Sequence, residues 1–282
     1  MQKVTILCVG KLKEKFYIDA AAEYVKRLSR FCKLELVELP EERLPEDPSP
    51  AQIEAALLKE AAAMAQSEPI HTKFPQPVED FPTLARTARE EDEELSGLLI
   101  RDLHLEKEDL SGLVLQDVVF DHCRLPGCDW FGTSFSDVTF NDRCCCSECR
   151  TTTNSYWLRF ACHETKALGI RLQNCRMRHG LLEQGRFSAA NWNQSRLREV
   201  RFSSSALTGS FFSRCIFTGV EFQQCDLSQV NFFHTPLEHV DLTTCTIDAL
   251  VLSEHCDELK GAVVDLYQAA ELSRRMGLVV KL

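Results

Sequence analysis

The sequence predicts a solenoid, a rod of stacked backbone turns, over most of its 282 residues. Three observations predict it: a large apolar residue recurs at every fifth position, a small or β-branched residue stands two positions before it, and a short polar residue often lies between them. The apolar series is unbroken from Leu172 to Leu252 and, in another phase, from Ile100 to Phe140. A period of five fits neither a helix face nor a strand face, so it indicates a repeated turn of chain.

Chance does not explain this period. The two series hold 26 positions in a chain that is 44% hydrophobic. Independent residues would give the full run with a probability of ~10⁻⁹.

The position two before each large residue predicts how the interior is filled. Because large and small residues alternate along the chain, we expect them to alternate down an interior wall. The residue between them is often Asn or Asp, which can bond its own backbone and stabilise a turn. The small positions are Gly185, Ala190, Ser195, Val200, Ser205, Ser210, Cys215, Val220, Cys225, Val230, Thr235, Val240 and Cys245.

Segments such as Cys225-Asp226-Leu227-Ser228-Gln229 and Val230-Asn231-Phe232-Phe233-His234 resemble pentapeptide repeats, over roughly residues 95 to 253. The resemblance implies a mainly β protein, a right-handed quadrilateral β-helix with four pentapeptides per coil and the large and small residues facing inward. With ~4.8 Å between stacked strands, seven or eight coils would give a rod of roughly 35 Å.

Residues 1–64 predict a small α/β segment in front of the rod. Val4–Val9 and Leu34–Leu39 are strand-like runs. Apolar residues at helical spacing over Phe16–Leu28 predict a helix between them. The acidic, Pro-rich stretch Pro40–Pro50 predicts a loop, and the capping-box pattern from Ser49 predicts a second helix.

Three parts of this segment carry a further resemblance. They are Val9-Gly10-Lys11-Leu12-Lys13-Glu14-Lys15, Glu23-Tyr24-Val25-Lys26-Arg27-Leu28-Ser29-Arg30 and Leu34-Glu35-Leu36-Val37-Glu38-Leu39-Pro40. They resemble the opening of the RlmH family of SPOUT methyltransferases, which implies S-adenosylmethionine-dependent modification of a pseudouridine in large-subunit rRNA.

The RlmH resemblance stops near residue 64. In that family the cofactor loop lies in the C-terminal half, around a Gly-Gly sequence, and this chain has no Gly-Gly dipeptide. No catalytic or cofactor-binding residue can therefore be carried over. A segment of ~64 residues rarely buries enough apolar surface to fold alone. We interpret the chain as a methyltransferase fragment fused to a repeat protein.

Residues 65–94 predict a linker and an N-terminal cap. Prolines at 69, 75, 77 and 82 predict extended chain as far as Phe81. Thr83–Leu95 predicts a short helix over the mouth of the rod, because a solenoid exposes an apolar end unless it is covered.

Residues 95–258 predict the repeat domain, and residues 259–282 predict a C-terminal cap. Asp265 is the expected N-cap of a helix over Leu266–Met276, and Gly277 is expected to end it. A last strand is expected over Leu278–Val280.

The repeat slips by two residues near 141–156. Four thiols, Cys144, Cys145, Cys146 and Cys149, lie in this slip and are candidates for a zinc or redox site. Adjacent side chains diverge along extended backbone, and Cys162 and His163 would complete a site only if the loop folded back. We therefore favour a loop with incidental cysteines and predict no metal.

The charge distribution bears on the partner. The net charge is -10, but residues 111–282 hold 17 Lys or Arg against 19 Asp or Glu, so the rod is nearly neutral. A cluster of arginines on the rod predicts either an ordinary solvated face or a patch for an anionic partner. Its members are Arg171, Arg176, Arg178, Arg186, Arg196, Arg198 and Arg201.

No phosphate-binding loop, dinucleotide fingerprint or nucleophile elbow occurs. Many of the 14 cysteines fall at repeat positions, where a small buried hydrophobe suits, so we expect a reducing, cytoplasmic setting, with no signal peptide and no membrane span. We predict a bacterial, non-catalytic scaffold without catalytic residue or cofactor. It would bind an unknown macromolecule, a protein in first place and nucleic acid in second, with a homodimer as an open alternative.

Two other functions are carried as alternatives. One is a 23S rRNA pseudouridine N3-methyltransferase of the RlmH type, which rests on the N-terminal resemblance. The other is a DNA mimic that protects a topoisomerase. The arginine cluster counts against the mimic, because cations spoil an imitation of a phosphate backbone.

Overall fold

The computed structural model describes residues 2–9, 26, 32–39, 75–149, 152–275 and 279–280. The chain divides into two compact units, Met1–Ser67 and Glu68–Leu282. In the first unit, β1 (Gln2–Val9) and β2 (Cys32–Leu39) pair in parallel. Both predicted strands are thus confirmed, each beginning two residues early. The helices predicted over Phe16–Leu28 and from Ser49 lie outside the described residues, apart from Lys26, which is helical.

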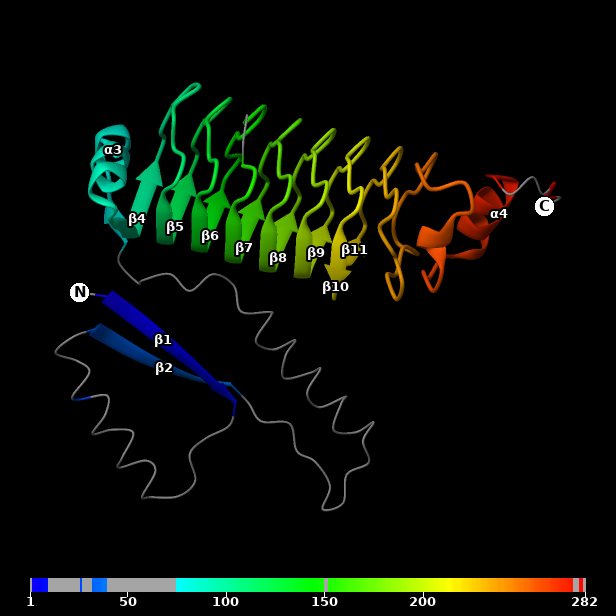
Figure 1. Cartoon of the computed structure of the whole chain (residues 1–282), viewed down its shortest axis with the longest axis horizontal. Coiled ribbons are helices and arrows are strands. Elements are labelled where there is room, and N and C mark those ends of the chain that lie inside the picture. Colours follow the sequence, from blue (N-terminus) through cyan, green and yellow to red (C-terminus); the bar gives the residue numbers. More distant parts are fainter. Residues whose placement is uncertain are drawn as a thin grey trace, which may run out of the picture. The chain divides into compact units, whose positions relative to one another are not determined.

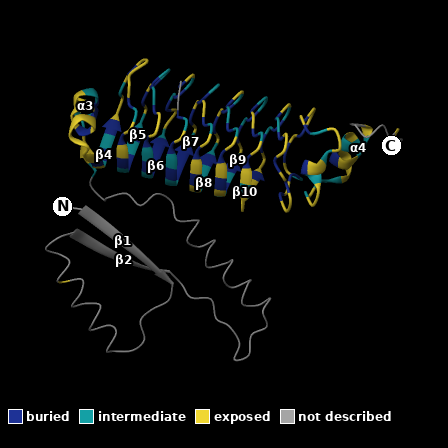
Figure 2. Ribbon diagram, in the orientation of Figure 1, coloured by how far each residue is buried: buried dark blue, intermediate teal, exposed yellow. Residues whose placement is uncertain are grey.

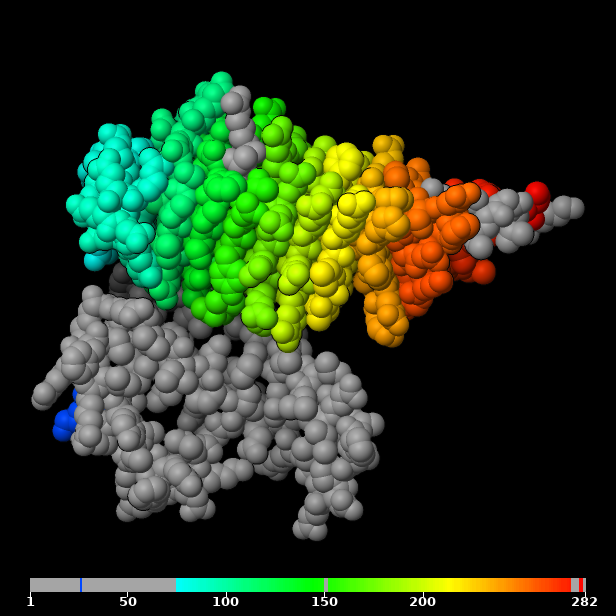
Figure 3. Space-filling view, viewed as in Figure 1, coloured from blue at the N-terminus to red at the C-terminus, as the bar shows by residue number. Residues whose placement is uncertain are grey.

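The second unit is a parallel β-solenoid of about seven turns, as predicted (Figure 1). The strands are β3 (Gln76–Pro77), β4 (Glu94–Arg101), β5 (Val114–Asp121), β6 (Ser134–Asn141), β7 (Tyr156–His163), β8 (Arg176–Glu183), β9 (Arg196–Ser203), β10 (Ile216–Thr218) and β11 (Glu221–Gln223). From β3 to β9 each strand pairs in parallel with the next strand in the sequence, and β10 and β11 both pair with β9, so each coil lies directly on the previous one. Figure 3 shows the coils as successive ridges of side chains along the rod.

From β4 to β6 and from β7 to β9 one coil takes 20 residues, but the coil between β6 and β7 is longer. Ser134 on β6 pairs with Tyr156 on β7, a step of 22 residues, whereas Tyr156 pairs with Arg176 on β8, a step of 20 residues. On the wall that contains Arg124, Cys145 and Lys166, each parallel bridge joins residues 21 apart in the sequence. The slip predicted near 141–156 is therefore two separate one-residue insertions at successive corners, which return the strands to register.

The solenoid has four walls, and each wall contributes one large inward residue per coil. Walls 2, 3 and 4 follow wall 1 in steps of five residues, as in Phe202, Leu207 and Phe212, which are fully buried. Phe217 on wall 1 is partly buried and packs edge-on against Phe212 with 5.8 Å between ring centroids. Wall 1 is defined here by Leu95, Leu115, Phe135, Trp157, Met177, Leu197 and Phe217.

The interior ladder of large residues is confirmed. Buried residues largely alternate with exposed or partly exposed ones along β8 and β9 (Figure 2). Aromatic rings stack from coil to coil, as in Trp192 on Phe212, whose planes lie 6° apart at a centroid distance of 5.4 Å.

The small position has a second role that explains its composition. Ser195 Oγ donates to the Leu172 carbonyl at 2.6 Å, and Cys215 Sγ donates to the Trp192 carbonyl at 3.0 Å. In both cases the acceptor belongs to the coil below. Ser, Thr and Cys are therefore suited here because they are small and also satisfy a buried carbonyl.

Helix α3 (Phe81–Glu91) caps the first coil. Its N-cap Asp80 accepts from the backbone N–H of Thr83 at 3.1 Å, and Phe81 is fully buried beneath it. The predicted helix over Thr83–Leu95 was placed too late. Asp80 starts it earlier, and the left-handed Asp92 ends it before β4 begins at Glu94.

Helix α4 (Leu266–Arg275) caps the other end. Asp265 and Gln268 form a reciprocal capping box, with N···O distances of 2.8 and 3.0 Å, as the Asp265 prediction requires. Gln268 also donates to the Leu242 and Cys245 carbonyls of the last coils at 2.8 Å. A short 3₁₀ helix, η1 (Asp257–Leu259), precedes it. The expected last strand is wrong for its described part, because Val279 and Val280 are not in a strand.

No helix in the described ranges has the length and apolar character needed to cross a membrane.

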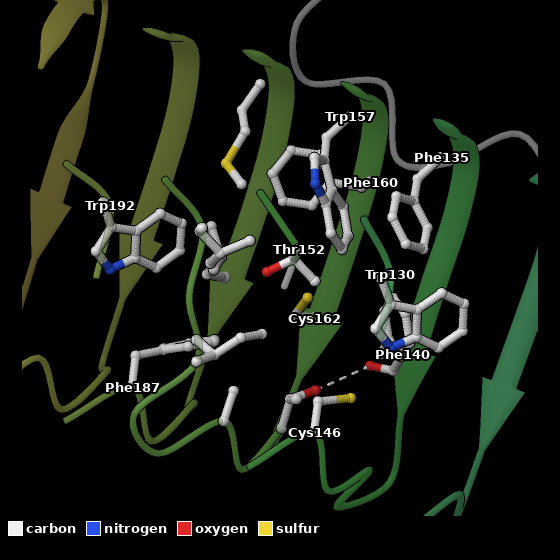
Figure 4. Close-up of a pocket in the computed structure, with 16 residues that line it drawn as sticks. Trp130, Phe135, Phe140, Cys146, Thr152, Trp157, Phe160, Cys162, Phe187 and Trp192 are labelled. Carbon is white, nitrogen blue, oxygen red and sulfur yellow. Dashed lines mark hydrogen bonds between the residues drawn. The ribbon is translucent and has the colours of Figure 1, made fainter. Parts of the chain in front are cut away.

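The interior departs from the large–small rule around the insertions. Cys146, Thr152, Cys162 and Ala167 occupy central positions that elsewhere hold larger residues, mostly Leu, Phe or Trp. They help to line an apolar cavity of about 40 Å³ (Figure 4). Phe160 fills part of the missing volume from a small position.

Phe160 in turn requires a glycine one coil above. It stacks in the column Val118, Val138, Phe160, Gly180, Val200. A Cβ on Gly180 would lie 2.2 Å from the Phe160 ring. Phe160 and Gly180 are therefore a size-compensated pair in a column of valines.

Gly180→Val should destabilise the solenoid by about 1–3 kcal/mol, because its side chain overlaps the Phe160 ring. Phe160→Val should also cost about 1–3 kcal/mol, because it enlarges the cavity. The double variant restores the valine column and should be more stable than either single variant, as measured by urea denaturation. Purely additive losses would contradict the pairing.

Candidate functional site

Wall 1 presents a flat sheet face to solvent. The two residues that flank each inward residue point outward, since side chains alternate across a strand. From the first coil to the seventh these pairs are Glu94 and Ser96, Val114 and Gln116, Ser134 and Ser136, Tyr156 and Leu158, Arg176 and Arg178, Arg196 and Arg198, and Ile216 and Thr218.

Four arginines gather on this face, and we call Arg176, Arg178, Arg196 and Arg198 the arginine quartet. Arg176 pairs with Arg196 and Arg178 with Arg198 in adjacent strands, and all four side chains are exposed. The strands lie ~4.8 Å apart, and two residues along a strand span ~6.7 Å, so the quartet occupies a small rectangle.

The quartet is short of counter-charge. Arg198 lies 3.5 Å from Glu199. Within the described chain, no carboxylate lies within 4.0 Å of the other three guanidinium groups. Like charges directly opposite in neighbouring strands are destabilising, so this arrangement favours an external anion.

The other three arginines of the predicted cluster lie elsewhere. Arg171 pairs with Asn191 on wall 4, Arg186 bridges to Ala206 on wall 3, and Arg201 lies on wall 2. Arg201 is also neutralised by Glu221 at 2.7 Å. The structure therefore brings together four of the seven arginines, because residues five apart in this chain face different directions.

Apolar side chains flank the quartet on both sides along the rod. Tyr156 and Leu158 precede it and are partly exposed, and Ile216 follows it with 53% exposure. Arg, Tyr and aliphatic residues together are typical of protein interfaces.

A column of ionisable residues runs beside the quartet, at the corner between walls 1 and 2. We call Asp117, Asp137, Arg159, His179 and Glu199 the edge column. Each has a positive φ and stands two residues after a wall 1 residue, so its members stack in consecutive coils.

Side chains of the edge column contact one another between successive coils. Arg159 donates to both carboxylate oxygens of Asp137 at 2.7 and 2.6 Å, and this bonding raises the pKa of Arg159. His179 Nδ1 lies 2.6 Å from Glu199 Oε2. Burial lowers the pKa of His179, and nearby arginines lower it further against the pull of Glu199.

Sequence reasoning missed the edge column. The signal was present as ionisable residues spaced by one full coil. The period of five alone does not reveal the edge column. In the other five-residue repeats, the residue two positions after the large inward residue is most often Gly, Asn, Gln or Ala.

Three of the four cysteines at the insertions face the core. Cys144, Cys146 and Cys149 are buried, and only Cys145 is partly exposed. A hydrogen bond with Cys123, together with burial, raises the pKa of Cys144. A hydrogen bond with Cys149, together with burial, does the same for Cys146. Protonated thiols are poor nucleophiles and poor metal ligands, so Cys144 and Cys146 are better suited to packing as small hydrophobic residues.

A shallow surface hollow lies near the first insertion. Asp121, His122 and Asp142 place one ligand atom each within 4.8 Å of one another there. Asp121 is already paired with Arg101 at 2.8 Å, and Arg124 and Arg143 also line the hollow. We assign no ion to it, because these cations oppose a metal.

Two family models match the chain. One, described as a predicted SPOUT methyltransferase, matches residues 2–74. The other, described as pentapeptide repeats, matches residues 182–219 and 195–232. The chain therefore carries pentapeptide repeats behind an N-terminal segment similar to a SPOUT methyltransferase, and both sequence resemblances are confirmed.

Curated relatives match the N-terminal segment. Ribosomal RNA large subunit methyltransferase H of Lactobacillus delbrueckii subsp. bulgaricus is 56% identical over 57 residues, which are 20% of this chain and 36% of that protein. The same enzyme of Streptococcus uberis is 52% identical over 59 residues, 21% of this chain and 37% of that protein. The chain thus spans little more than a third of the length of these relatives.

Solved structures match the solenoid at low similarity. QnrB1, a plasmid-mediated fluoroquinolone resistance protein, has 22% identity and a TM-score of 0.36 over 66% of this chain and 92% of that chain. HetL of the cyanobacterium Nostoc, a pentapeptide repeat protein involved in heterocyst differentiation regulation, has 15% identity and a TM-score of 0.27 over 66% of this chain and 98% of that chain. At these TM-scores the likeness carries no functional argument.

The edge column should make stability depend on pH. Because folding lowers the pKa of His179, the unfolded chain takes up that proton first as pH falls. The free energy of unfolding therefore decreases as the pH falls below ~6.5, the ordinary pKa of histidine. His179→Gln should flatten the dependence of Tm on pH between about pH 7 and pH 5. The control is His239→Gln, in the same corner column but with an 88% exposed side chain. An unchanged slope in His179→Gln would refute the assignment.

Proposed function

We propose that the solenoid is a non-catalytic scaffold that binds a protein through wall 1. The single observation that carries this proposal is the arginine quartet, which lies between Tyr156 and Leu158 on one side and Ile216 on the other. Three of its members have no carboxylate within 4.0 Å among the residues that the structure describes. A cytoplasmic setting remains part of the proposal.

The shape of the site supports binding rather than catalysis. The quartet lies on an open sheet face, whereas substrates and small ligands are usually held in concave pockets. A flat face with cations in its centre and apolar neighbours suits an acidic, partly apolar surface of another protein.

A nucleic-acid partner has less support. Its affinity would rest on many phosphate contacts, whereas wall 1 offers four arginines and carries Glu94 at its first coil. A role as a DNA mimic has less support still, since the quartet would repel the DNA-binding surface that a mimic must fit.

Site-specific photo-crosslinking in cells tests the proposal. Benzoylphenylalanine in place of Val114, exposed on wall 1, should capture a protein. The same probe in place of Thr246, exposed on wall 3, should capture far less. Equal capture at the two positions, or capture of nucleic acid at Val114, would contradict a protein-binding wall 1.

A second candidate function is rRNA methylation, favoured by the 56% identity to methyltransferase H over 57 residues. The resemblance ends before the half that holds the cofactor loop in that family. Isothermal titration of the full chain with S-adenosylmethionine should therefore show no saturable binding. Saturation at one equivalent would favour the methyltransferase over the scaffold.

A further inference from the structure

Wall 1 carries opposite charges at two places along the rod. An acidic run, Glu90, Glu91, Asp92, Glu93 and Glu94, ends α3 and enters the first coil of wall 1. All five residues are exposed, and within the described chain none has a cation within 4.0 Å. The adjacent cation, Arg89, pairs instead with Asp109 at 2.8 Å.

The acidic run and the arginine quartet cannot meet within one molecule. The quartet lies on β8 and β9, four and five coils beyond β4, which is ~19–24 Å along the rod at ~4.8 Å per coil. The coils between them are fixed by backbone pairing. Among the described residues of a single copy, the acidic run therefore has no cation within 4.0 Å, and the quartet has one carboxylate, Glu199 beside Arg198.

A second copy, turned antiparallel, compensates both groups at once. If two wall 1 faces meet about a two-fold axis near Ser134 and Ser136, the acidic run of each copy lies over the quartet of the other. Ion pairs then form twice, because a two-fold interface uses the same surface on both subunits.

The coils between the charges fit the same arrangement. The two serines at the axis are small and let the faces approach closely. Val114, which is 41% exposed, then lies over Tyr156 and Leu158 of the second copy. Apolar residues thus meet apolar residues, and acids meet arginines.

We propose that the protein bound by wall 1 is a second copy of this chain, in an antiparallel dimer joined by the acidic run and the arginine quartet. This inference rests on the proposed protein-binding function of wall 1 and names its partner. Nucleic acid fits less well, since a strand lying along the rod would cross the quartet and then the acidic run.

The surface area that the dimer would bury on wall 1 indicates weak association. With the axis at β6, the two faces overlap from the end of α3 to β9, ~29 Å by ~16 Å, which is somewhat under ~500 Å² on each copy and about 900 Å² in total. That is slightly below the ~1,000 Å² expected of a stable specific interface. We expect micromolar affinity with a strong salt dependence, because exposed ion pairs are screened.

Sedimentation velocity of the full chain tests the dimer. At about 50 mM NaCl the chain should dimerise with rising concentration, and about 500 mM NaCl should weaken association at least about tenfold. The quadruple variant R176E/R178E/R196E/R198E should be monomeric, and so should E90K/E91K/E93K/E94K. An equimolar mixture of the two should dimerise again, since every contact is then complementary.

R171E/R186E is the matched control, because it reverses two exposed arginines on walls 4 and 3. It should dimerise like the unchanged chain. A monomeric unchanged chain, a dimer that survives reversal of the quartet, or a mixture that stays monomeric would overturn the proposal. Capture of a different protein at Val114 by a monomeric chain would contradict this inference but would still support the proposed scaffold function.

Discussion

Backbone hydrogen bonds between successive coils are the constraint on which this structure depends. Leu207 N–H, for example, donates to the Asp226 carbonyl at 2.9 Å, and Arg196 N–H donates to the Cys175 carbonyl at 2.9 Å. Such bonds satisfy the polar backbone of every wall and leave the interior to side chains. They also fix which residues stack, because a residue must lie over the one that stands a full coil before it.

Stacking by coil turns every position into a column, and neighbours in a column must fit each other. In the interior the criterion is volume, so Phe160 needs Gly180 above it. At the corner between walls 1 and 2 the criterion is charge, and Arg159 donates a hydrogen bond to the carboxylate of Asp137 in the coil below. On the open face of wall 1 the arginine columns have no such internal solution. That difference is why wall 1, rather than the corner, is the surface to assign to a partner.

Much of the fold could be predicted from the sequence, because the period of five is a direct consequence of four walls per coil. Inward residues such as Phe202 and Phe212 and the Asp265 cap followed from local pattern. Contacts between residues in neighbouring coils could not be predicted from local pattern. The division of the slip into two insertions depends on which corner absorbs each extra residue, and the splitting of the arginine cluster depends on wall assignment, which proximity in sequence does not give. Arg176 and Arg196 are neighbours, whereas Arg198 and Arg201 face different walls.

The most direct test of the coil constraint is circular dichroism with thermal melting of two deletions. Removing residues 196–215, one full coil, places Ile216 over Arg176 and keeps every inward residue in phase, so the β signal per residue and a cooperative melt should persist. Removing residues 196–213, two residues fewer, shifts every later inward residue out of phase and should abolish the cooperative melt. Equal behaviour of the two deletions would contradict the account.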